Sequence, residues 1–181
     1  ATATSTICMI PQVSKHGGEI QQAAERLGVP SSRVLDASAS LVPWTPRLRW
    51  RLLSQGLRDY PDRQYTLLSA QIAALHRVAA QHVLPGNGAA ELFTWAARDA
   101  ASVGTSVLCK PAFSDYSRAL CSWDARSVFE PLPLEWSDNF PQSFPSISGG
   151  KVLWICNPHN PTGHLWSRAS LESLLQRYEL V

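Results

Sequence analysis

The segment 157–163, with the sequence Asn-Pro-His-Asn-Pro-Thr-Gly, constrains the fold of this chain more than any other feature. It directly follows an apolar run at residues 152–156 that is typical of a buried strand. Pro161 fixes its own φ angle and restricts Asn160 to extended conformations, while Gly163 can adopt angles that other residues reach only with strain. The segment therefore predicts a rigid turn after a strand, with the side chain of Asn160 presented in a defined direction.

Hydrophobic periodicity predicts that helices and strands alternate from residue 66 onwards. Strands are expected at residues 106–110, 127–132 and 152–156. A short helix is expected at residues 113–121. Three further helices are expected, each with one buried apolar face. These faces are Leu68, Ile72, Leu75 and Ala79 in the first helix, Leu92, Trp95, Ala96 and Ala100 in the second, and Leu171, Leu174, Leu175 and Tyr178 in the third, which Ser167 can cap. This alternation predicts an α/β fold, a three-layer sandwich with a mainly parallel sheet, in which ligand sites lie at the carboxyl ends of the strands.

The first 64 residues have a different character. They contain scattered prolines and one short helical candidate at residues 19–27, closed by Gly28. We expect residues 1–64 to form an N-terminal arm and part of a small domain, and residues 65–181 to form the first part of a large domain. The proline-containing stretch 131–150 is expected to be a surface excursion of that large domain.

Composition excludes several classes of protein. The 181 residues are 45 % hydrophobic and 17 % charged, which is typical of a globular chain with a buried core. The net charge of +2 and the scattered Lys and Arg residues do not indicate a nucleic-acid partner. No run of 18 apolar residues and no leader-like segment is present, so no membrane partner is expected. The four cysteines lack Cys-x-x-Cys spacing, and we expect free thiols and a cytoplasmic location.

Other sites with recognisable motifs are not indicated. His159 and His164 flank the proline turn, but no further Cys or carboxylate cluster has ligand spacing, so no metal is expected. No Gly-x-Ser-x-Gly nucleophile elbow occurs.

A second glycine-containing turn, Gly-Asn-Gly-Ala-Ala-Glu at residues 86–91, precedes a predicted helix. The first amides of a helix lack internal acceptors and its dipole favours an anion, so this turn is a candidate phosphate site. Glu91 stands where a dinucleotide fingerprint has its third glycine, and no Gly-Lys-Ser follows. The alternative is an Asn-Gly turn that only reverses the chain direction.

The segment 157–163 resembles the Asn-Pro-x-Asn-Pro-Thr-Gly loop of fold-type I pyridoxal-phosphate enzymes, the class I/II aminotransferase superfamily. The resemblance implies a pyridoxal 5'-phosphate cofactor whose phenolic oxygen is bound by Asn160. Residues 84–91 resemble the phosphate turn of the same superfamily, which implies backbone contacts from Gly88, Ala89 and Ala90. Phe113 matches the aromatic residue that stacks on the cofactor ring, although a purely packing role is the alternative.

Two further segments carry the resemblance. Tyr60, in a Tyr-Pro-Asp run, matches a tyrosine that reaches the cofactor phosphate of a neighbouring subunit, which implies a homodimer; a simple proline turn is the alternative. His16, Gly17 and Gly18, with residues 36–40, resemble the branch of threonine-phosphate decarboxylases of cobalamin biosynthesis, relatives of histidinol-phosphate aminotransferases. This implies a small phosphorylated amino acid as substrate, bound by His16, Gly17, Gly18 and Ser40. The branch usually has Asn-Ile-Asn-Pro where this chain has Ser-Leu-Val-Pro at residues 40–43.

The family also needs a lysine that binds the cofactor covalently and an aspartate at the pyridine nitrogen, both downstream of the asparagine loop. The lysines of this chain are Lys15, Lys110 and Lys151, and none occupies the expected segment. We therefore expect an N-terminal part of such an enzyme, which lacks the catalytic lysine and is inactive by itself. The expected activity of the complete protein is that of a decarboxylase, with a histidinol-phosphate aminotransferase-like transaminase or a non-catalytic phosphate-binding α/β module as alternatives.

Overall fold

The computed structural model describes residues 17–38, 44, 50, 54, 56–57, 60–132 and 149–181. His16 and Ser40, two of the predicted substrate contacts, lie outside these residues. The chain divides into two compact units, Lys15–Pro85 and a larger unit that contains Gly86–Val181. This division groups residues 65–85 with the N-terminal part, whereas the sequence placed the domain boundary after residue 64; the domain organisation of the complete fold stays a prediction.

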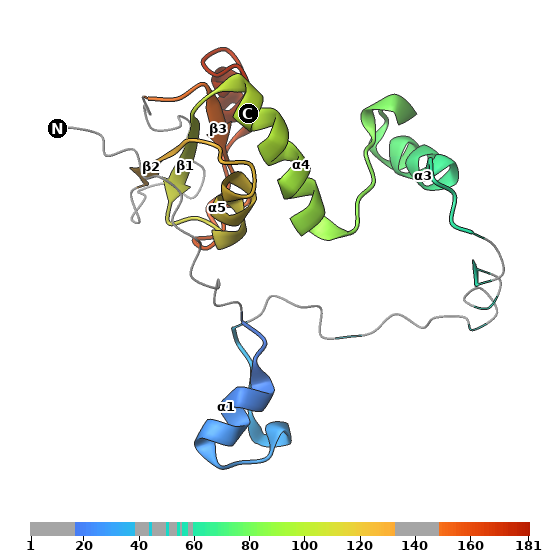
Figure 1. Ribbon diagram of the computed structural model, residues 1–181, viewed down its shortest axis with the longest axis vertical. Coiled ribbons are helices and arrows are strands. Elements are labelled where there is room, and N and C mark those ends of the chain that lie inside the picture. Colours follow the sequence, from blue (N-terminus) through green and yellow to red (C-terminus); the bar gives the residue numbers. More distant parts are fainter. Residues whose placement is uncertain are drawn as a thin grey trace. The chain divides into compact units, whose positions relative to one another are not determined.

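The larger unit alternates helices and strands in the predicted order (Figure 1). Its elements are α4 (Gly88–Val103), β1 (Ser106–Lys110), α5 (Ser114–Cys121), β2 (Ser127–Pro131), β3 (Val152–Trp154) and α6 (Arg168–Leu174). The strands form a parallel sheet in the order β2-β1-β3, and Ser106 of β1 is paired with Ser127 and with Val152. Leu180 forms one further parallel bridge with Val152. The predicted α/β class with a parallel sheet is confirmed.

The sheet is covered on both faces because side chains of a strand point alternately to opposite sides. Val107 of β1 packs in one cluster with Leu174 of α6. Leu108, the next residue, packs in another cluster with Ala100 of α4 and Leu120 of α5. Each of these five side chains is at most 1 % exposed, and burial of a leucine contributes about 1.5–3 kcal/mol. The three layers are therefore α6, the sheet, and α4 with α5.

Helix α4 buries only part of the face predicted for it, since Ala100 is buried as expected but its neighbours on that face are not. Ala97 and Ala100 are fully buried and Phe93 packs against their cluster, whereas Ala96 is exposed and Trp95 is only half-buried. Small side chains allow α4 to approach its neighbours closely, and close packing selects this face over the more hydrophobic one.

The remaining elements of the larger unit differ from prediction mainly at their ends. Strand β3 ends at Trp154, two residues earlier than expected. Ser167 caps α6 as predicted, since its hydroxyl accepts a hydrogen bond from the Ser170 N–H at 3.1 Å. The helix ends at Leu174, so Leu175 is 64 % exposed while Tyr178 is buried.

The smaller unit contains α1 (Ile20–Leu27), η1 (Ser31–Arg33), α3 (Thr66–His76) and η2 (Ala80–His82). Gly28 closes α1 in the left-handed conformation, as predicted. The predicted apolar stripe of α3 is wrong, because the helix ends at His76 and its buried residues are Ser69 and Ala73. Leu75 is 76 % exposed. The periodicity identified a helix correctly but not the side on which its neighbours lie.

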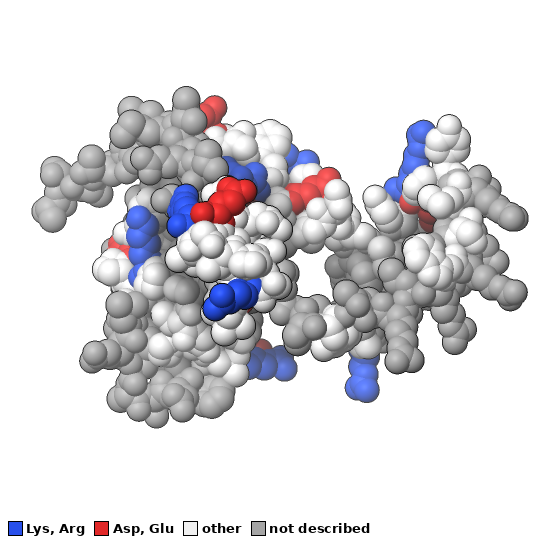
Figure 2. Space-filling view, turned by 90° about the horizontal axis from the view of Figure 1, so that it is seen from below, with Lys and Arg blue, Asp and Glu red and all other residues white. Residues whose placement is uncertain are grey.

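The cysteines and the surface bear on the remaining expectations. Cys109 and Cys156 are free thiols as expected, but Cys121 is disulfide-bonded, which corrects the expectation of free thiols throughout. Within the described residues, no helix has the length and apolar character needed to cross a membrane. Among the described residues on the face in view, Figure 2 shows Lys and Arg interspersed with Asp and Glu.

Candidate functional site

Three segments of the larger unit meet at one edge of the sheet. The loop with Phe113 follows the carboxyl end of β1, and the loop with Asn160 follows that of β3. Helix α4 leads through Gly104 into the start of β1 and packs along the sheet, so its first turn lies towards the same edge. A small cavity of about 10 Å³ is lined from both strand loops, by Ala112 on one side and Asn160 on the other. The fold thus places these three segments at the carboxyl ends of the strands, where ligands of such sheets bind.

The first turn of α4 offers backbone amides to an anion. Gly88 has φ +79°, a left-handed angle that favours glycine. Its own N–H donates to the Gly86 carbonyl at 2.9 Å. The Asn87 N–H donates to the Glu91 carboxylate. The N–H groups of Ala89 and Ala90 have no acceptor among the described residues, so they are the groups of this turn that a phosphate could bind.

Phe113 is held by other aromatic rings. It precedes α5 as its N-cap residue and is half-buried. Its ring lies edge-on to Phe93 of α4, with centroids 6.2 Å apart, and to Tyr116 of α5, with centroids 5.7 Å apart. Such pairs contribute about 0.5–1.5 kcal/mol beyond area burial. The ring therefore has a fixed orientation and also takes part in packing, so the two interpretations made from the sequence are compatible.

The two asparagines of the 157–163 loop have different environments. Asn157 holds the loop, since its Oδ1 accepts from the Trp166 N–H at 2.8 Å and its Nδ2 donates to the Trp166 carbonyl at 3.4 Å. Asn160 is exposed, and its side chain makes no hydrogen bond to a described residue. A loop held by Asn157, with the exposed amide of Asn160 projecting from it, agrees with the predicted rigid turn. The anchoring by Asn157 was not predicted.

A second unpredicted feature is a chain of polar contacts inside this loop. The Thr162 hydroxyl lies 2.7 Å from Nδ1 of His159 and 2.7 Å from Nδ1 of His164. The ring of His159 also donates to the Pro111 carbonyl. Because a neutral imidazole has one N–H, Nδ1 of His159 accepts the Thr162 proton and Thr162 accepts from His164. The loop after β3 is thereby tied to the loop after β1.

Burial keeps the His159 ring neutral. The side chain is 6 % exposed. Burial lowers the pKa of His159 below its ordinary value, the hydrogen bond to Pro111 opposes this shift, and the nearby His164 adds to it. Within the described ranges, no group of three His, Cys, Asp or Glu side chains is placed to hold a metal ion.

The cavity wall also contains a tyrosine and a cysteine. Burial raises the pKa of Tyr116, and its hydrogen bond to the Cys156 thiol raises it further. The thiol lies 3.2 Å from the Pro158 carbonyl, to which it donates. Both side chains line the same cavity as Asn160.

The smaller unit carries the other predicted residues. Tyr60 is 99 % exposed. Asp62 makes its turn rigid, because its carboxylate accepts from the N–H groups of Gln64 at 2.9 Å and Thr66 at 2.8 Å. These hydrogen bonds lower the pKa of Asp62. The motif is thus a capped turn that leaves the tyrosine ring accessible.

Gly17 and Gly18 pack against the segment that the sequence grouped with them. The Gly18 N–H donates to the Ser38 hydroxyl at 3.0 Å, and this hydroxyl donates to Asp36 at 2.6 Å. A Cβ atom at Gly17 would lie 2.0 Å from the Ser38 carbonyl oxygen, so only glycine fits. An open cavity of about 740 Å³ lies beside these residues and is lined also by Arg26.

Comparison with known proteins decides the family. Residues 22–181 match the model of aminotransferase class I and II. The chain belongs to this aminotransferase family. The threonine-phosphate decarboxylase of Salmonella typhimurium is 33 % identical over 174 residues, which are 91 % of this chain and 46 % of that protein. The histidinol-phosphate aminotransferase of Roseiflexus castenholzii is 26 % identical over 167 residues, which are 86 % and 45 % of the two proteins.

Solved structures agree with this aminotransferase assignment. The L-threonine-O-3-phosphate decarboxylase from Porphyromonas gingivalis has a TM-score of 0.57 and 25 % identity, over 72 % of this chain and 40 % of that one. OvoB has a TM-score of 0.57 at 20 % identity, over 73 % of this chain and 38 % of that one, and shows the fold alone. The chain spans about half the length of the curated relatives it matches. The resemblance inferred from the loops is confirmed, and the family is one of pyridoxal-phosphate-dependent decarboxylases and aminotransferases.

Proposed function

We propose that this chain is the N-terminal part of a pyridoxal-phosphate-dependent threonine-phosphate decarboxylase. The observation that carries the proposal is the exposed, unbonded amide of Asn160 at the same sheet edge as the unsatisfied N–H groups of Ala89 and Ala90. These groups complement the two polar ends of pyridoxal phosphate, a phenolic oxygen and a phosphate. The donor set fits this cofactor.

Each residue would then have one task. The N–H groups of Ala89 and Ala90, with the α4 dipole, would hold the phosphate, and Gly88 would let the chain turn closely around it. The Phe113 ring would restrict the tilt of the pyridine. Asn160 Nδ2 would donate to the phenolic oxygen. When bound, pyridoxal phosphate withdraws electrons from the α-carbon of an amino substrate and makes a bond at that carbon labile.

The substrate would be a small phosphorylated amino acid, as in the names of the relatives. We assign its contacts to His16, Gly17, Gly18 and Ser40. Support comes from the close packing of the glycines on Ser38 beside an open cavity lined by Arg26, a side chain suited to an anion. The complete protein is proposed to be a cytoplasmic homodimer, with the exposed Tyr60 reaching the phosphate site of the partner subunit.

Histidinol-phosphate aminotransferase activity is the second candidate, favoured by the similarity to several such enzymes. Product analysis distinguishes the two. With the protein expressed from its complete gene, we expect carbon dioxide to be released from O-phosphothreonine. Transfer of the amino group of histidinol phosphate to 2-oxoglutarate would instead support the aminotransferase.

The cofactor itself is tested by absorbance titration with pyridoxal 5'-phosphate. In the protein expressed from its complete gene, we expect a new absorbance band at a longer wavelength than that of the free cofactor. The substitution Asn160→Ala should weaken this band. An unchanged spectrum with retained binding of inorganic phosphate would instead favour a non-catalytic phosphate-binding module.

A further inference from the structure

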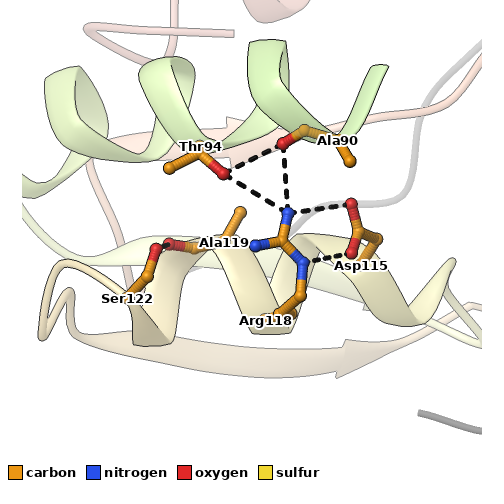
Figure 3. A network of polar contacts seen from close by, with 6 residues as sticks. All are labelled: Ala90, Thr94, Asp115, Arg118, Ala119 and Ser122. Atoms are coloured by element: carbon orange, nitrogen blue, oxygen red, sulfur yellow. Dashed lines mark hydrogen bonds and ion pairs between the residues drawn. The ribbon is translucent and has the colours of Figure 1, made fainter. Parts of the chain in front are cut away.

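Arg118 of α5 connects this helix to α4, and the proposed cofactor contacts lie at the starts of these two helices. Neither Arg118 nor its partner Asp115 is among those contacts. Figure 3 shows the guanidinium of Arg118 between the Asp115 carboxylate on its own helix and the first turns of α4. Its Nε and Nη2 donate to the two carboxylate oxygens of Asp115 as a planar fork. Its Nη2 also lies 3.1 Å from the Ala90 carbonyl and 3.3 Å from the Thr94 hydroxyl.

The burial of Asp115 makes this contact strong. Its side chain is 8 % exposed, whereas that of Arg118 is 38 % exposed. A buried carboxylate without a partner is strongly unfavourable, and a fork between a carboxylate and an arginine is favourable and geometrically specific. Asp115 therefore fixes the direction of the guanidinium, and the guanidinium fixes α5 on the first turn of α4.

The far end of α5 has a second attachment to the same part of α4. The Trp123 indole N–H, just after α5, donates to the Thr94 carbonyl at 2.8 Å. The Thr94 hydroxyl donates to the Ala90 carbonyl at 2.9 Å. Two points of attachment prevent rotation of α5 about the first, so the start of α5 has one position relative to Ala90.

Phe113 lies immediately before the start of α5, and Ala90 is the last residue of the proposed phosphate turn. The contacts of Arg118 therefore set the offset between the aromatic ring and the amides. A cofactor that touches both must match this offset, and an error of about 1 Å in such a site can cost about 100-fold in rate.

We propose that Arg118 and Asp115 are positioning residues that hold the phosphate-binding turn of α4 in register with the Phe113 ring. This inference rests on the proposed function. It predicts that removal of both side chains reduces the contribution of the phosphate group to ligand affinity. This reduction should be separate from any change in the stability of the folded protein.

The test uses pyridoxine 5'-phosphate and pyridoxine, which differ only in the phosphate and form no covalent bond with a lysine. Their dissociation constants are measured by titration calorimetry on the protein expressed from its complete gene. The ratio of the two constants gives the contribution of the phosphate. In the double variant Asp115→Leu with Arg118→Met, which leaves no unpaired charge, we expect this ratio to fall about tenfold or more.

The control is Asp99→Leu with Arg98→Met, which removes an exposed ion pair on the outer surface of the same α4. It should leave the ratio unchanged. Arg118→Lys keeps a positive partner for Asp115 but loses the planar fork. It should keep a melting temperature close to that of the unmodified protein and still show a reduced ratio, so it decides the matter even if the double variant does not fold.

Two results would overturn the inference, and they differ. If the unmodified protein binds the phosphorylated ligand no better than pyridoxine, the proposed phosphate site fails and the positioning role fails with it. If the unmodified protein shows a large ratio that persists in Arg118→Lys and in the folded double variant, the positioning role alone is wrong.

Discussion

The side chain of Asn157 holds the backbone of Trp166 at both its N–H and its carbonyl, at 2.8 Å and 3.4 Å. This pair of hydrogen bonds closes the loop from which Asn160 projects. The first asparagine of the motif therefore holds the loop, while the side chain of the second is exposed.

Substitution separates these two tasks. Asn157→Ala should lower the free energy of unfolding by about 1–3 kcal/mol, because the Trp166 groups lose their partners. Asn160→Ala should leave the free energy of unfolding within about 0.5 kcal/mol of the original, since exposed substitutions rarely matter more, but should weaken binding of pyridoxal phosphate. Urea unfolding and absorbance titration of both variants measure the contrast. Equal effects of the two substitutions on stability would contradict it.

The glycine pair near the N-terminus gives a steric prediction. Gly17→Ala would place a Cβ atom 2.0 Å from the Ser38 carbonyl oxygen, so the two segments must separate and the Gly18 to Ser38 hydrogen bond is lost. We expect faster hydrogen exchange at Gly18 and weaker binding of O-phosphothreonine. Gly56→Ala is the control, because a Cβ atom there would meet nothing within 4 Å. Unchanged exchange in Gly17→Ala would show that the packing is wrong.

Burial of His159 predicts an acid-sensitive loop. Its pKa is lower in the folded chain than in the unfolded one, so the unfolded chain binds more protons as the pH falls below about 6.5. The free energy of unfolding should therefore decrease from pH 7.5 to pH 5. His159→Asn should reduce this dependence, while His76→Asn, at the exposed end of α3, should retain it. Denaturant unfolding at both pH values provides the measurement, and an identical slope in all three proteins would count against the buried neutral ring.

The thiols should differ in reactivity. Burial raises the pKa of Cys109 to about 12, and the nearby Glu130 adds to the shift. Because the thiolate is the reactive form, Cys109 should resist iodoacetamide at pH 8 in the folded protein and react in 6 M urea. Mass spectrometry of the peptide that contains Cys109 follows this reaction. Rapid labelling under native conditions would disprove burial of this side chain.

The sequence predicted the order of elements well because strands and helix caps leave local patterns. Strand β1 has the predicted bounds, and the cap at Ser167 was expected from its residue type alone. It did not predict the buried face of α3 and predicted that of α4 only in part, at Ala100, because buried faces depend on which small side chains, such as Ala97, allow neighbouring elements to approach.

The candidate site shows the same division. Asn160 and the turn at Ala89 and Ala90 were expected from local proline and glycine patterns and from the resemblance of these loops to the aminotransferase family, and their binding roles stay predictions. The contacts of Arg118 with Ala90, and of Asn157 with Trp166, join residues that are far apart or have no motif of their own. Only the folded chain brings them together.

We propose that groups at one edge of the sheet bind both the phosphate and the phenolic oxygen of pyridoxal phosphate. A crystal structure of the protein from its complete gene, grown with pyridoxal 5'-phosphate, tests it most directly. We expect phosphate oxygens within about 3.2 Å of the Ala89 and Ala90 nitrogens, with Asn160 Nδ2 at the phenolic oxygen and the Phe113 ring against the pyridine. A cofactor bound elsewhere, with Asn160 facing bulk water, would contradict the account.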